Sequence, residues 1–207
     1  MGRFLIFVCS PKGNAGLPSA VEEASRVQKI HAASVFGKDD DCTAQQLRDQ
    51  LQLKPGVRRF LFIGHGDAET PDKRTTLVFT DAEGRLTTVE PDILKELLGS
   101  VSEGKGGPLQ LVFLNGCCTS NLAERVHNAG VPFVVSWSTV VEDKAATLFS
   151  ETFFKKLARL DQDQKLTDKD RYLRATHRSP DLPRSPPISP DLPRSPLYPH
   201  QVRAGVL

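Results

Sequence analysis

The stretch Phe60-Leu61-Phe62-Ile63-Gly64-His65-Gly66 decides the fold of this chain. Its first four side chains are all apolar rather than alternately apolar and polar, which is typical of a strand buried on both faces of a sheet. Runs of similar character occupy Phe4–Cys9 and Leu109–Leu114, and a further strand is expected at Val131–Trp137. Strands buried on both faces predict a mainly parallel sheet, because such a sheet is covered by helices on each side.

Helical patterns lie between these strands. Ser19 with Glu22, and Thr43 with Gln46, form capping boxes that open two helices. Further elements are expected as a hairpin around 76–89 and as helices at 91–98, 121–130 and 143–157, the last capped by Asp143. The alternation of strands and helices predicts an α/β fold.

The C-terminal part of the chain has a different composition. Ser179–Pro186 and Ser189–Pro196 both read SPDLPRSP, and residues 176–207 hold eight of the fifteen prolines. Such a segment has too few apolar side chains to offset the entropy of ordering. We expect one domain at residues 1–160 and a charged, then proline-rich, disordered tail at 161–207. The tail is either simply solvated or a polyproline ligand for an adaptor domain.

Charge and apolar content exclude several classes of protein. Residues 1–175 hold equal numbers of basic and acidic side chains and no basic cluster, which argues against a nucleic-acid partner. The longest apolar run, Phe4–Cys9, is far shorter than the roughly twenty residues that span a membrane. Four irregularly spaced cysteines and the lack of a secretory signal are typical of a cytoplasmic protein without structural disulfides. No nucleotide-binding or metal-ligand motif occurs, so no cofactor and no metal are expected.

Two strand ends carry residues suited to catalysis. His65 lies between two glycines after one strand, and Asn115-Gly116-Cys117-Cys118 follows another, just before a helix. Since ligands bind at the carboxyl ends of parallel strands, neighbouring strands would bring His65 and a thiol together as a Cys-His dyad. Taken singly, a cysteine here is more often a buried structural residue, and Gly-His-Gly is often a tight turn with a surface histidine.

An ordered set of motifs then carries a family resemblance, over about residues 4–158. The set comprises Phe60-Leu61-Phe62-Ile63-Gly64-His65-Gly66, Val112-Phe113-Leu114-Asn115-Gly116-Cys117, and Gly130-Val131-Pro132 leading to Val134-Val135-Ser136-Trp137, Val141, Asp143 and Ala145-Ala146. It resembles a CHAT domain, a caspase-like module related to caspases, separases and gingipains and often attached to tetratricopeptide repeats. The resemblance implies a caspase-like fold and a cysteine endopeptidase that acts on a peptide or protein through a thioester acyl-enzyme.

Residue roles follow from the same resemblance. It implies that His65 is the dyad base, that Cys117 is the nucleophile, and that the Gly66 backbone is an oxyanion donor. It also favours Cys117 over Cys118, because the nucleophile directly follows the small residue of the Asn-small-Cys motif, here Gly116. Side chains alternate along a strand, so we expect the two thiols to point in different directions and Cys118 to be buried.

A second function stays open. Where CHAT domains have a further helix and a closing strand, this chain has the charged segment Asp161–Arg174. The alternative is therefore a catalytically silent caspase-like interaction module, whose proline-rich tail recruits an adaptor or a tetratricopeptide-repeat partner. Asp67, Glu69 and Asp143 either line a pocket selective for basic residues or are solvated, and Trp137 is expected in the core.

Overall fold

The computed structural model describes residues 3–10, 16–37, 42–52, 56–66, 68–70, 74–81 and 83–176. Its centre is a parallel five-stranded sheet with the order β2-β1-β3-β8-β9. These strands are β1 (Arg3–Cys9), β2 (Ala33–Phe36), β3 (Val57–Gly64), β8 (Leu111–Asn115) and β9 (Phe133–Ser136). The predicted α/β fold with a mainly parallel sheet is confirmed.

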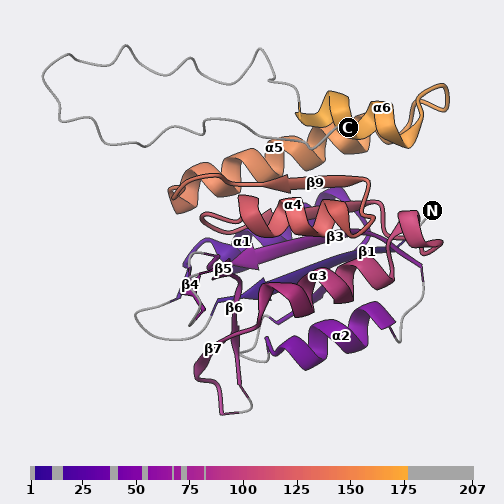
Figure 1. The fold of residues 1–207 in the computed structure, drawn as a ribbon. Helices are drawn as coiled ribbons and strands as arrows, with labels where there is room; N and C mark the ends of the chain where they lie inside the picture. The colour runs from indigo at the N-terminus through magenta and orange to yellow at the C-terminus, as the bar shows by residue number, and fades with distance from the viewer. Residues whose placement is uncertain are drawn as a thin grey trace, which may run out of the picture.

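Helices cover both faces of the sheet. They are α1 (Ala20–Ile30), α2 (Ala44–Gln52), α3 (Pro91–Ser100), α4 (Ser120–Asn128), α5 (Asp143–Asp161) and α6 (Asp168–Thr176), with a short 3₁₀ turn at Glu103–Lys105. Helices α2, α3 and α4 pack on one face and α1, α5 and α6 on the other. Figure 1 shows α5 and α6 above the sheet and α2 and α3 below it.

Two small antiparallel pairs complete the described structure. β4 (Ala68–Glu69) pairs with β5 (Thr75–Thr76), and β6 (Val78–Thr80) pairs with β7 (Leu86–Thr88). The second pair is the hairpin expected at 76–89, and it projects away from the sheet (Figure 1).

Strands β1 and β8 are buried on both faces, as their continuous apolar runs predict, whereas β2 is only half-buried. In β1, Phe4, Ile6 and Val8 pack against α1 and α5, whereas Leu5 and Phe7 pack against the opposite layer. All of these side chains are at most 5% exposed. Burying each one stabilises the fold by about 1.5–3 kcal/mol relative to leaving it in water, so β1 contributes strongly to stability.

Only one of the predicted capping boxes forms. At α2, Gln46 N donates to Thr43 Oγ1 at 3.2 Å and Thr43 N donates to Gln46 Oε1 at 3.2 Å. At α1, Ser19 makes no side-chain cap, because its backbone is helical (φ −84°, ψ −12°) rather than extended as a cap requires. Asp143 does not cap α5 either, and it accepts the Ser19 N–H at 3.3 Å instead.

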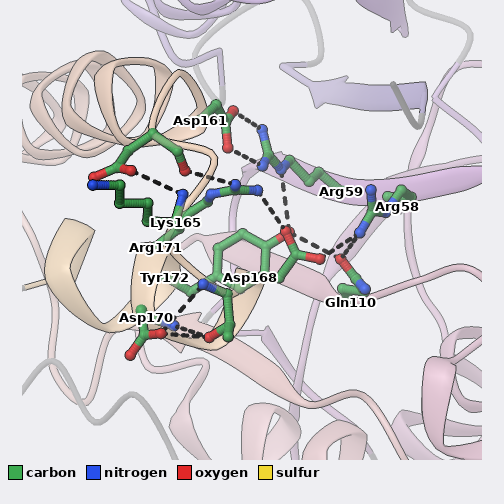
Figure 2. Close-up of polar contacts among 11 residues, drawn as sticks. Arg58, Arg59, Gln110, Asp161, Lys165, Asp168, Asp170, Arg171 and Tyr172 are labelled. Atoms are coloured by element: carbon green, nitrogen blue, oxygen red, sulfur yellow. Dashed lines mark hydrogen bonds and ion pairs between the residues drawn. The ribbon is translucent and has the colours of Figure 1, made fainter.

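The folded structure extends past the boundary expected at residue 160. Arg59 on β3 donates two hydrogen bonds to Asp161, at 2.6 and 2.7 Å, and Arg58 contacts Asp168 at 2.6 Å (Figure 2). Tyr172 on α6 is 2% exposed and packs on the sheet. Residues 161–176 are therefore ordered, which corrects the predicted tail boundary. The two proline-rich repeats lie outside the described residues.

Within the described part of the chain, no helix combines the length and the apolar character needed to cross a bilayer. The four cysteines, all of them described, carry no disulfide.

Candidate functional site

The two strand ends predicted to meet do lie side by side. β3 and β8 are parallel neighbours, with Ile63 paired to Asn115 in the register. The turns that follow them, Gly64–Gly66 and Gly116–Cys118, therefore leave the sheet at the same edge. This is the edge at which α/β proteins bind their ligands.

The backbones of these two turns are in direct contact. A Cβ at Gly116 would lie 2.6 Å from the Gly64 carbonyl oxygen, and a Cβ at Gly66 would lie 2.7 Å from the Cys117 carbonyl oxygen. Both distances are shorter than any side chain tolerates, so only glycine allows this approach. The structure thus brings together the turns that carry His65 and Cys117, and both side chains are half-buried.

The His65 turn is also held from its other side. The backbone carbonyl of His65 accepts the N–H of Val78, at 3.0 Å, from the start of β6. The predicted pocket residue Asp67 and the side chain of Glu69, which come next, lie outside the described residues. Asp143, the third predicted pocket residue, is half-buried at the start of α5.

Cys117 contacts the segment that follows β9. Its Sγ accepts the backbone N–H of Val141 at 3.4 Å, and the thiol lies 3.7 Å from the Val141 carbonyl oxygen. The neighbouring Cys118 N–H donates to Thr139 O at 3.2 Å. The thiol is therefore placed by residues 139–141 as well as by its own turn.

Cys118 differs from its prediction. Strand alternation predicts a buried side chain, but β8 ends at Asn115 and both cysteines lie in the turn beyond it. Cys118 has a left-handed backbone (φ +53°), which is uncommon outside glycine, and it is half-buried rather than buried. Its left-handed conformation turns the chain sharply from β8 into α4.

Thr119 closes this turn. Its Oγ1 lies 3.2 Å from Leu114 O and 3.1 Å from Gly116 O, and it accepts the backbone N–H of Trp137 at 3.3 Å. The hydroxyl is buried, so these contacts replace its hydrogen bonds to water. One side chain thus joins the Cys117 turn to the end of β9.

A buried chain of hydrogen-bonded polar side chains, which the sequence pattern did not predict, lies beneath the turn. Asn115 Nδ2 donates to Glu23 Oε1 at 2.7 Å, the Trp137 indole N–H donates to Asn115 Oδ1 at 2.6 Å, and Thr147 Oγ1 donates to Glu23 Oε2 at 3.2 Å. Trp137 is 4% exposed, which confirms its core position. Burial raises the pKa of the Glu23 carboxyl, and the nearby Asp143 raises it further, although the hydrogen bonds oppose this. The sequence does hold one sign of this carboxyl, because Glu23 falls among the apolar residues on the buried face of α1.

Among the residues that the structure describes, no three His, Cys, Asp or Glu side chains are arranged to hold a metal ion.

Comparisons with known proteins match the chain to a family. A family model described as the CHAT domain matches residues 6–191. No curated protein matches the sequence. One similar solved structure is titled "Last common ancestor of HMPPK and PLK/HMPPK vitamin kinases", at 12% identity over 84% of this chain and 97% of that chain. Its TM-score of 0.32 is too low to support any inference.

Proposed function

Since the chain belongs to the CHAT domain family, which includes caspase-like cysteine peptidases, we propose that it is a cysteine endopeptidase with Cys117 as nucleophile and His65 as general base. The observation that supports this most is the contact between the two turns. Glycines on both sides allow the backbones to approach so closely that the imidazole and the thiol rise from the same edge of the sheet. A Cys-His dyad requires this arrangement.

The proposed reaction is acyl transfer through the Cys117 sulfur. His65 takes the thiol proton as the sulfur attacks the carbonyl carbon of a peptide bond, and the imidazolium then gives this proton to the departing amine. The resulting thioester is hydrolysed by water, with His65 acting again as the base. The Gly66 N–H is the proposed donor to the oxyanion that forms at the carbonyl oxygen.

Labelling with a library of peptidyl acyloxymethyl ketones tests this proposal. These electrophiles form a thioether with a catalytic cysteine when the dyad is assembled. We expect an adduct on Cys117 under reducing conditions, lost in Cys117→Ala and in His65→Ala and retained in Cys118→Ala. An adduct on Cys118, or labelling that is unaffected in His65→Ala, would overturn the assignment.

One observation favours the silent interaction module as the second candidate. The Cys117 sulfur already hydrogen-bonds to the backbone of Val141, and attack on a peptide would have to share or break these contacts. No labelling at any tested pH, with or without calcium, in protein whose fold is verified would support this alternative.

A further inference from the structure

Glu23 is a buried carboxyl group that the proposed reaction does not use. It is 1% exposed, on the face of α1 that packs against the sheet. The groups that act on it are Asn115, Thr147, Ser150 and a second carboxyl, Asp143, and none of these four is a cation. A buried carboxyl held in this way costs stability, so its presence next to a candidate active site calls for a functional reason.

The hydrogen bonds of Asn115 show what Glu23 holds. An indole N–H can only donate, so the oxygen of the Asn115 amide must face Trp137, and its NH₂ must face Glu23. The amide is therefore fixed at both ends and has one orientation. Asn115 is the last residue of β8, two positions before Cys117.

The same chain of contacts reaches the nucleophile turn from its other side. The backbone N–H of Trp137 donates to Thr119 Oγ1 at 3.3 Å, and the Trp137 carbonyl accepts the Ser120 N–H at 3.1 Å. Trp137 thus contacts residues before and after Cys117. If Glu23 no longer holds Asn115, the amide loses the acceptor that fixes its orientation, and the indole is then bonded to an amide that can turn.

We propose that Glu23 is a positioning residue for Cys117, acting through Asn115 and Trp137 on the turn that carries the thiol. Glu23 touches no reacting atom, and the proposal rests on the proposed role of Cys117 as nucleophile. What the role needs is an acceptor oxygen facing Asn115. Glutamine supplies this oxygen at nearly the same volume, whereas leucine fills the space without it.

The test compares Glu23→Gln with Glu23→Leu, both in the full chain. In labelling by the ketone probe, Glu23→Leu should lower the maximal inactivation rate about tenfold while the half-saturating probe concentration stays unchanged, since binding is not altered. Glu23→Gln should stay within about twofold of wild type. Equal decreases in the maximal inactivation rate of both variants, or no decrease in Glu23→Leu, would overturn the proposal.

Amide hydrogen exchange separates this proposal from the peptidase proposal, because it needs no activity. Glu23→Leu should lower the protection of the Cys118 and Ser120 amides, which donate to Thr139 and Trp137, and leave the Leu47 amide in α2 unchanged. A uniform loss of amide protection, including that of Leu47, would assign Glu23 a merely structural role and reject the proposal. If Glu23→Leu does not fold, Trp137→Phe is the second variant. Lower protection from exchange confined to the Cys118 and Ser120 amides supports the proposal. Unchanged protection of these two amides rejects it.

Discussion

Gly116 faces Gly64 at the edge of the sheet so closely that a Cβ at Gly116 would lie 2.6 Å from the Gly64 carbonyl oxygen. The obstacle is backbone, which cannot swing aside as the end of a side chain can. The distance between the His65 turn and the Cys117 turn therefore depends on the absence of one methyl group.

Gly116→Ala should push these two turns apart. We expect a loss of about 1–3 kcal/mol in the free energy of unfolding, from overpacking, together with loss of probe labelling. Gly106→Ala is a useful control, because its Cβ enters open space at φ +80° and reports backbone strain without a collision. Urea unfolding and labelling measured on both variants check the prediction. Labelling of Gly116→Ala at the wild-type rate would contradict it.

Arg59→Ala should destabilise the domain strongly. It leaves the Asp161 carboxylate, whose side chain is 8% exposed, without its guanidinium. Breaking a buried ion pair in this way costs about 3–5 kcal/mol. Arg85→Ala removes an arginine whose side chain is 73% exposed and should have far less effect. Urea unfolding compares the two variants, and similar losses of stability would show that the Arg59–Asp161 pair does not stabilise the end of α5.

Truncation after residue 160 tests how much α6 and the end of α5 contribute to stability. Removing residues 161–176 deletes Asp161 and α6 and exposes the sheet face that Tyr172 covers. We expect the truncated chain to unfold at a lower urea concentration than a chain that ends after residue 176. Equal midpoints would mean that α6 contributes nothing to the stability of the domain.

The sheet could be predicted from the sequence, whereas the attachment of α6 could not. Four of the five strands leave apolar runs in the sequence, which predict their place between helices. The half-buried strand β2 (Ala33–Phe36) leaves no such run and was not predicted. Helix α6 buries only Tyr172 and Ala175, and an ion pair between Arg58 and Asp168, which are 110 positions apart, joins it to β3. From the sequence, a charged segment of this kind is expected to be exposed to solvent, because the neighbouring residues do not indicate its distant partner.

The candidate site, too, was predicted where it depends on local sequence and not where it depends on distant contacts. Strand ends and glycines predicted that the turns of His65 and Cys117 lie together, since both features are local. The half-buried position of Cys118 depends on a left-handed backbone that no residue pattern marks. Glu23 stands out in the sequence as a carboxylate on an apolar helix face. Its partners Asn115 and Thr147 come from other elements, so the sequence pattern does not identify them.

Thiol alkylation of the native protein should divide the cysteines into two pairs. Cys9 and Cys42 are 1% and 0% exposed, whereas Cys117 and Cys118 are half-buried. Brief treatment with iodoacetamide should therefore modify only the second pair, and treatment in denaturant should modify all four. Peptide mapping by mass spectrometry reads the result. Rapid modification of Cys42 in native protein would show that the α2 side of the sheet opens readily.

The buried carboxyl of Glu23 should make stability depend on pH. Because burial raises its pKa in the folded state, the unfolded chain releases this proton at lower pH than the folded protein does. The stability linked to Glu23 is then fully present below its ordinary pKa, near 4.5, and is lost as pH rises towards and through the raised value.

Glu23→Gln removes this titration. The free energy of unfolding of wild type minus that of Glu23→Gln should therefore fall as pH increases above 4.5, by about 1.4 kcal/mol for each unit by which the pKa is raised. Urea unfolding of both proteins across this range measures the difference, and a difference that rises with pH would mean that the carboxylate is stabilised in the fold.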